Sequence, residues 1–341
     1  MHCKTLLAAL LLVVLPGLPL AAQTKPDFFP EDVNPDQLAL RCFCQPGVRF
    51  KSRSRGLELS YALSGPSTFE PEKGEFSEPY SSFDRLSHFI FKLRVPVINR
   101  DAFKLLIGYN YEKEAYRFGQ IGTDFQDVFE DLDGHSLRSN SFSVILTKPF
   151  GETAYLAGRF RYSANGDYPT IMDFGKEYSI YNALLSLGFK RTEDFEWGFG
   201  IWYSQSFRRA SPLPFVFYNR NFNHRWGVEA VIPAYIFVRF NLSDKDILLT
   251  GFEYDSQSYR IAIDRSPLTD YDYAINHSEM VLNLKWERWL APWIWLDLQA
   301  GYQLNFSTDF EAKSLETPSF EVEPTPSPLF KVGVFLSPPG E

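Results

Sequence analysis

The chain has 341 residues, of which 45% are hydrophobic and 17% aromatic, and its formal net charge at pH 7 is −8. This negative charge argues against nucleic acid or anionic lipid as a main partner. Cys42 and Cys44 are too few for a disulfide-rich domain, and with no further ligand near them a zinc site is not expected. In an oxidising compartment we expect a local or intermolecular disulfide, and we predict no metal and no cofactor.

Residues 1–22 have the features of a cleaved signal peptide. Lys4 provides a basic start, residues 6–15 form an unbroken apolar run, and Ala21-Ala22 offers small residues for cleavage before Gln23. The apolar run has ten residues, too few to span about 30 Å of hydrocarbon as a helix. We therefore expect export rather than a retained anchor.

Residues 23–55 read as an N-terminal extension, in the periplasm or folded into a lumen, because prolines at 26, 30, 35 and 46 interrupt any long element. Lys51, Arg53 and Arg55 alternate with serines, so an extended chain would carry three cations on one face. They could bind a phosphate or a lipid head group. The simpler expectation is a solvated flank, which charge runs usually are.

From Gly56 onward, short runs with an apolar residue at every second position follow one another, as expected for strands with one apolar face. These runs predict an all-β, antiparallel up-and-down transmembrane β-barrel over residues 56–336, with residues 337–341 as a tail. We expect about 12 strands (12–14), and an even number. The runs lie at 57–63, 89–95, 103–111, 142–146, 156–162, 181–189, 197–207, 226–232, 236–240, 247–251, 259–263, 280–286, 294–306 and 330–334.

The clearest run is 294–306, where seven apolar residues alternate with a face whose only large apolar residue is Trp295. Soluble strands average about 5–6 residues, whereas a tilted membrane-spanning strand needs about 9–11. A soluble periplasmic β-sandwich is the main alternative fold, but the length of this run favours a membrane barrel.

The connections alternate in length, which is typical of outer-membrane barrels with long loops outside and tight turns on the periplasmic side. Long loops are expected at 64–82, 112–135, 163–177 and 307–328, and short turns near 99–101, 151–152, 192–194 and 291–292. The same pattern excludes βαβ units, whose crossovers need helices.

Two sets of residues are candidates for functional positions. The polar faces of two successive strands are expected to face the lumen, in a channel or in a closed, salt-bridged interior: Glu279, Asn283, Lys285, Glu287, Asp297, Gln299, Gln303 and Asn305. Four tryptophans around the turn at 291–292 are expected in an aromatic girdle at the membrane boundary: Trp286, Trp289, Trp293 and Trp295.

No catalytic constellation is evident. Outer-membrane phospholipases place His and Ser on adjacent strands, but His277 and Ser278 are consecutive and would point to opposite faces of one strand. We therefore predict no catalytic residue, and a lipid-modifying enzyme ranks last among the functions considered.

Four segments, 214–218, 226–233, 251–254 and 258–261, resemble a group of porin-like or transporter-like bacterial outer-membrane barrels catalogued as a domain of unknown function. The resemblance is firmest over 178–306. It implies a barrel in the bacterial outer membrane and brings no catalytic residues. Such barrels often end on an aromatic residue recognised by the insertion machinery; here Phe335 is followed by a short tail and is the candidate signal.

The function predicted is a narrow channel or passive transporter for a small solute. The alternative is a structural or partner-docking barrel without transport, using its long acidic loops. The expected partners are outer-membrane lipid, the barrel-insertion machinery and a small solute.

Overall fold

The computed structural model describes residues 47–72, 76–100, 102–151, 153–171, 175–205, 210–263 and 272–337. The predicted leader, Cys42, Cys44, most of the 23–55 extension and the tail beyond residue 337 lie outside these ranges.

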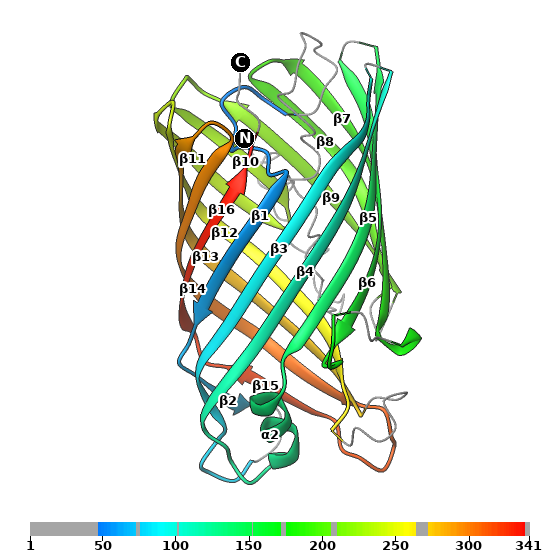
Figure 1. The fold of residues 1–341 in the computed structure, drawn as a ribbon, viewed down its shortest axis with the longest axis vertical. Coiled ribbons are helices and arrows are strands. Elements are labelled where there is room, and N and C mark those ends of the chain that lie inside the picture. Colours follow the sequence, from blue (N-terminus) through cyan, green and yellow to red (C-terminus); the bar gives the residue numbers. More distant parts are fainter. Residues whose placement is uncertain are drawn as a thin grey trace, which may run out of the picture.

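The structure is a closed antiparallel β-barrel (Figure 1). The sheet holds 16 strands, and it closes through the pairing of β1 with both β16 and β3. The short strands β2 (Ser67–Pro71) and β15 (Phe320–Pro324) extend one end of the barrel, and the other 14 form its wall. The wall strands are β1 (Leu57–Ser64), β3 (Ser82–Arg100), β4 (Phe103–Gln120), β5 (Leu137–Phe150), β6 (Ala154–Gly166), β7 (Ser179–Thr192), β8 (Phe195–Gln205), β9 (Ala210–Asn221), β10 (Trp226–Ile232), β11 (Tyr235–Ser243), β12 (Asp246–Ile261), β13 (Tyr273–Ala291), β14 (Ile294–Ala312) and β16 (Ser327–Leu336).

The predicted barrel class is confirmed, but the favoured number of about 12 strands is wrong, because the wall has 14. Strand β9 is not among the predicted runs, although its segment 214–218 is one of those that carry the family resemblance, because apolar residues on both of its faces leave no clear period of two. The separate runs 247–251 and 259–263 belong to the single strand β12.

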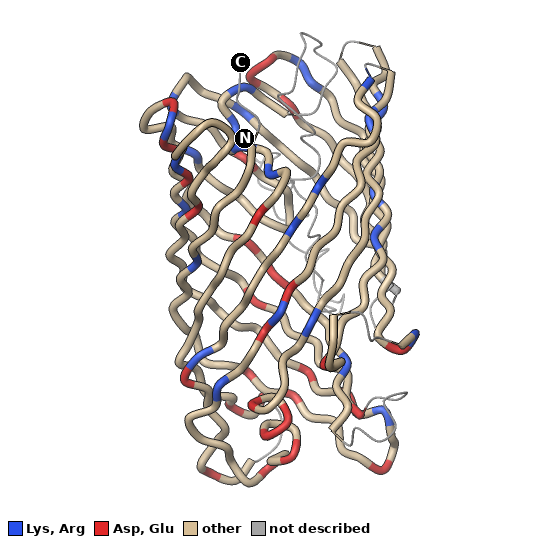
Figure 2. Tube along the Cα trace, in the orientation of Figure 1, with Lys and Arg blue, Asp and Glu red and all other residues tan. Residues whose placement is uncertain are grey.

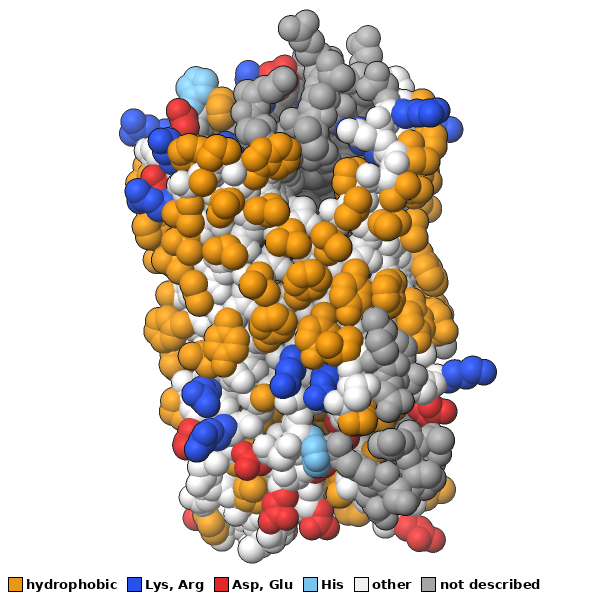
Figure 3. All heavy atoms as spheres, viewed as in Figure 1, with side chains coloured by type: hydrophobic (Ala, Val, Ile, Leu, Met, Phe, Trp, Pro, Cys, Tyr) orange, Lys and Arg blue, Asp and Glu red, His pale blue; other side chains and the backbone are white. Residues whose placement is uncertain are grey.

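Alternation decides which residues face outward. On β5, Phe142, Val144 and Leu146 are 46%, 46% and 42% exposed, whereas Ile145 between them is fully buried. The same pattern recurs on the other wall strands, and the face seen in Figure 3 carries a broad hydrophobic band. Soluble monomers rarely expose apolar patches of this extent.

The two ends of the barrel differ (Figure 1). The turns β3–β4, β5–β6, β7–β8 and β13–β14 lie at the end where β1 begins and β16 ends, and they coincide with the four predicted short turns. The opposite end carries β2, β15 and the helix α2 (Gln126–Gly134). Three loop starts were wrong: β4 continues to Gln120 before α2, β6 continues to Gly166, and β14 continues to Ala312, since each strand extends past the point where the simple alternation breaks.

An aromatic cap (Phe69, Phe83, Phe129, Tyr259, Tyr273, Phe310, Phe320 and their apolar neighbours) closes the α2 end of the lumen. Inward side chains from β3 and from β12–β14 meet in it, and Phe129 of α2 is 1% exposed at its centre. The lumen is therefore filled with side chains at this end.

Among the residues that the structure describes, no helix is long and apolar enough to cross a membrane.

Candidate functional site

The interior of the barrel is divided into an apolar and a polar sector. Inward residues of β4–β12, with Trp295 and Phe335, form one apolar cluster. Against the wall made by β1, β3, β4, β12–β14 and β16 lies the lumenal cavity, with a volume of about 200 Å³, and residues of β10 and β11 also line it. Its charged and imidazole-bearing lining consists of Arg53, Arg55, His88, Lys92, Glu112, Glu114, Glu229, Glu253, Asp255, His277, Glu279, Lys285, Glu287 and Lys331.

Residues 47–56, called the N-terminal strap below, cross the barrel at the end opposite α2 (Figure 1). Its backbone and side chains bind carboxylates on one strand after another. The Gly47 amide donates to Glu196 on β8 at 2.7 Å, and Ser52 donates to Glu229 on β10 through its amide (3.0 Å) and hydroxyl (2.6 Å). The Arg53 guanidinium lies 5.0 Å from the Trp295 ring centroid on β14. The strap is therefore fastened across the lumen by side chains from several parts of the wall.

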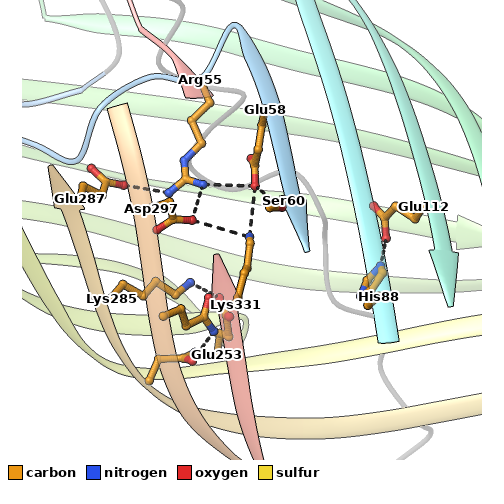
Figure 4. A network of polar contacts seen from close by, with 12 residues as sticks. Arg55, Glu58, Ser60, His88, Glu112, Glu253, Lys285, Glu287, Asp297 and Lys331 are labelled. Carbon is orange, nitrogen blue, oxygen red and sulfur yellow. Dashed lines mark hydrogen bonds and ion pairs between the residues drawn. The ribbon is translucent and has the colours of Figure 1, made fainter. Parts of the chain in front are cut away.

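Arg55 is the most heavily bonded residue of the strap (Figure 4). Its guanidinium lies 3.2 Å from Glu58 Oε1, 2.9 Å from Glu287 Oε1 and 2.9 Å from Asp297 Oδ2. Lys331 Nζ lies 3.1 Å from the same Glu58 oxygen. All three carboxylates are at most 2% exposed. Three buried anions thus share two cations, which makes Arg55 difficult to replace.

The part of the lumenal cavity nearer the aromatic cap holds two histidine–carboxylate pairs. His88 on β3 lies 3.2 Å from Glu112 on β4, as Figure 4 shows. His277 on β13 lies 3.1 Å from Glu279 and 2.8 Å from the Thr308 hydroxyl. A further inward pair, Lys285 and Glu253, stands 2.9 Å apart between these groups and the Arg55 cluster. The cavity therefore offers polar partners of both signs along its length.

The structure places all eight predicted lumen residues on the inner face. Gln299 donates to Asn283, and Gln303 donates to Glu279 at 2.8 Å. Asn305 lies nearer the cap and donates to the carbonyl of Pro324 at 3.2 Å. The predicted set is thus brought together by adjacent strands β13 and β14, and the remaining members, Lys285, Glu287 and Asp297, take part in the ion pairs above.

The predicted tryptophan girdle is wrong for two of its four members. Trp286 is on the outward face of β13, and Trp293 is 48% exposed in the following turn. Trp295, however, is 4% exposed and stacks on Phe335 inside the barrel, with ring centroids 6.2 Å apart. Trp289 also packs against the inner apolar cluster. Trp289 and Trp295 each lie on the same strand face as an inward carboxylate. Because side chains of a strand alternate between its two faces, both tryptophans point inward despite their position near the turn.

The expected solvated flank at Lys51, Arg53 and Arg55 is also wrong. Lys51 is 4% and Arg55 7% exposed, and Arg55 binds wall carboxylates rather than solvent. Burial lowers the pKa of Lys51, since loss of hydration outweighs the attraction of Glu229 and Glu196. Sequence reasoning also missed Glu58, Glu229 and Glu253; each is a lone acid in an apolar run, and that signal could have marked them as inward.

Near its start, the N-terminal strap makes a contact with the barrel wall whose strength depends on pH. Arg49 donates to Asp194 in the β7–β8 turn at 2.7 Å, and this hydrogen bond lowers the pKa of the Asp194 carboxyl. Because the pKa of Asp194 is lower in the folded than in the unfolded protein, the contact stabilises the fold at pH values above the unfolded-state pKa of about 3.9. This stabilisation is lost as the pH falls through the folded-state pKa.

We therefore expect Asp194→Asn to speed amide hydrogen exchange at Arg49 at pH 6 by a measurable factor that stays below about five-fold, because the pair is exposed. At a pH below the lowered pKa of Asp194 the variant and the parent should exchange alike, since the parent's carboxyl is then protonated and neutral, as the amide of the variant is at every pH. Equal exchange rates at pH 6 would contradict the assignment.

A closed barrel with an apolar outer band and a polar, partly charged lumen has the architecture of a membrane-spanning β-barrel. Residues 168–337, just under half of the chain, match the family model described as Domain of unknown function (DUF6268). The match runs from the segment before β7 to the end of β16, and it confirms the resemblance to a barrel family of unknown function.

Several solved barrels are distantly similar. A Pseudomonas aeruginosa FadL homologue has a TM-score of 0.42 at 9% identity, covering 82% of this chain and 89% of that one. The P. putida toluene transporter TodX has a TM-score of 0.36 at 8% identity (84% and 91% covered). The translocator domain of the autotransporter NalP from Neisseria meningitidis has a TM-score of 0.31 at 9% identity (82% and 88% covered). No curated protein gives a significant match.

Proposed function

We propose that this protein is an outer-membrane β-barrel of a two-membrane bacterium, and that it passes a small polar solute through a lumen that is closed at rest. The location is supported by the apolar outer band and by the difference between the two ends. Tight turns of such barrels face the periplasm and long connections face outward. The N-terminal strap then lies on the periplasmic side and the aromatic cap on the outside.

The observation that carries the transport proposal is the lumenal cavity between these two closures. A purely structural barrel would gain stability by packing this space with apolar side chains, because interiors favour close packing. Instead, the lining presents carboxylates, ammonium groups and imidazoles in exchangeable ion pairs. A small polar solute could replace some of these contacts.

Planar-bilayer recording tests the proposal. We expect the folded protein to give small, infrequent conductance steps, and Glu279→Gln to shift ion selectivity towards anions because it removes a lumenal negative charge. Glu316→Gln, on the exposed loop before β15, is the matched control and should leave selectivity unchanged. Repeated absence of steps from barrels that migrate as folded protein would favour the structural or docking role.

We propose no catalytic role. Thr308, His277 and Glu279 follow the hydroxyl–imidazole–carboxylate order of hydrolase triads. Thr308 is only 3% exposed, however, and is not among the residues lining the lumenal cavity. Thr308 and Glu279 engage both ring nitrogens of His277, so neither nitrogen is directed at Ser278. His277→Ala should therefore leave the background of lipid hydrolysis unchanged.

The role of Phe335 as an insertion signal stays a prediction. In the folded barrel this side chain is 1% exposed and packs between Trp295 and the Arg55 guanidinium, 4.4 Å from its ring centroid. Any recognition by the insertion machinery would therefore act before the barrel closes.

A further inference from the structure

The outer surface carries a group of cations at the edge of the apolar band, at the α2 end of strands β3–β5. Arg85 on β3, Lys113 and Arg117 on β4, and Arg138 on β5 alternate with inward residues such as Glu112 and Glu114, so they point away from the lumen. Figure 2 shows the charges along these strands, and Figure 3 shows Lys and Arg side chains gathered directly below the hydrophobic band. These four residues are called the basic patch.

The strand register sets cations of the basic patch against each other. Arg85 is directly opposite Arg117, and Lys113 is directly opposite Arg138. Opposed residues of an antiparallel pair have Cβ atoms about 4.5–5.5 Å apart, and like charges there are destabilising. Two such pairs on neighbouring strands indicate that an anion between them would relieve the repulsion.

The outer surface between the two cation pairs carries only small side chains and is therefore recessed. Ser87 on β3 and Ala115 on β4 are opposed there, and both side chains are small. Lys113 and Arg117 are four residues apart on one strand, about 13 Å at 3.3 Å per residue. Arg138 donates to the Tyr168 carbonyl, which follows β6, so its cation borders the patch on the β5–β6 side. A compact anionic group can lie on Ser87 and Ala115 with cations on both sides.

Aromatic residues define the depth of the basic patch in the membrane. On the same outer face, towards the apolar band, Phe89 lies 6.2 Å from Tyr111 and Tyr109 lies 5.0 Å from Phe142 between ring centroids. Such aromatic rings mark the membrane–water boundary of barrels. The cations of the basic patch lie next to these rings on the side of the α2 end, and therefore at the depth of the lipid head groups.

We propose that the basic patch binds the phosphorylated head group of a glycolipid in the outer leaflet, with its acyl chains along the aromatic residues. Guanidinium groups form paired, charge-assisted hydrogen bonds with phosphate. Two cation pairs fit a head group with more than one phosphate better than a single phosphate. The net charge of −8 argues against anionic lipid as a partner of the whole molecule, but it does not describe this local surface. The inference rests on the membrane orientation proposed above.

Native mass spectrometry of the folded, detergent-solubilised protein tests this inference, with diphosphorylated lipid A, phosphatidylglycerol or inorganic pyrophosphate added. We expect the unmodified protein to prefer lipid A, and R85Q/R117Q to bind it at least about tenfold more weakly. The control K148Q/R225Q removes two exposed cations at the other end of the barrel and should bind normally.

Thermal unfolding gives a second, independent readout. Without lipid, R85Q/R117Q should unfold at a higher temperature than the parent, because the like-charge pair is gone; with lipid A, only the parent and the control should gain stability. Equal lipid A binding by all three proteins, or an equal loss in the control, would overturn the proposal. Pyrophosphate binding as tight as lipid A binding would instead assign the patch to free phosphate. A barrel that binds lipid A but conducts no ions would overturn the transport proposal and leave the lipid-binding proposal standing.

Discussion

Replacing Arg55 by alanine is expected to lower the free energy of unfolding by about 3–5 kcal/mol, the usual effect of removing one partner from a buried ion pair. The substitution removes the guanidinium from Glu58, Glu287 and Asp297, which are at most 2% exposed in the parent, and leaves Lys331 as the remaining cation of the group. It also removes the guanidinium from the Phe335 ring. The N-terminal strap should then detach from the wall at its β1 end.

Limited proteolysis measures this release, because trypsin cleaves after Lys51 and Arg53, which are buried or half-buried when the strap is bound. Cleavage should be fast in Arg55→Ala and slow in the parent. Arg49→Ala is the matched control: it removes an exposed strap arginine bound to Glu193 and Asp194, and should cost less than about 1 kcal/mol. An Arg55→Ala barrel that resists trypsin as well as the parent does would disprove the anchoring role.

Replacing Phe129 by alanine is expected to cost about 3–5 kcal/mol, as for other buried phenylalanines. Its ring lies at the centre of the aromatic cap, with centroids 5.3 Å from Phe69, 5.7 Å from Phe118 and 6.0 Å from Phe310. The helix α2 contacts the wall mainly through this face, which also carries Val128 and Leu132. Loss of the ring should therefore loosen the closure of the lumen at the α2 end.

Urea unfolding and bilayer recording together measure the effect of Phe129→Ala. Leu315→Ala, in the loop before β15, is the control; its side chain is fully exposed, so the change should stay within about 0.5 kcal/mol. Because the strap and the cap close the lumen in series, Phe129→Ala combined with Arg55→Ala should conduct more than either change alone. Equal conductance of the single and double variants would exclude two closures.

Strand β14 shows how much of the wall could be predicted from sequence. Its alternation over 294–306 correctly assigned Tyr302 and Phe306 to the outer face and Asp297 and Gln303 to the inner face. Period-two alternation reports the side of the sheet directly, so the short turns and the inner faces of β13 and β14 followed from it. Trp289 and Trp295 were misplaced because position near a turn was given more weight than alternation.

The elements that were missed are those whose stability comes from distant partners. The helix α2 has nine residues, too short to be stable alone, and it forms against aromatic rings from β2, β14 and β15. The N-terminal strap has no strand or helix pattern, and its contacts with Glu196, Glu229 and Glu287 span 149 to 234 residues of sequence. A local sequence pattern cannot predict contacts between residues so far apart in the chain.

The sequence by itself determined the barrel class and the division of most wall strands into an outer and an inner face, because these depend on the order of apolar and polar residues along one strand; the leader over residues 1–22 stays a prediction. The tertiary structure alone decided that the wall has 14 strands, that the strap and the cap close the lumen, and that four cations of β3–β5 stand opposite one another. Each of these depends on the register between strands and on contacts across the barrel, which bring together residues far apart in the chain.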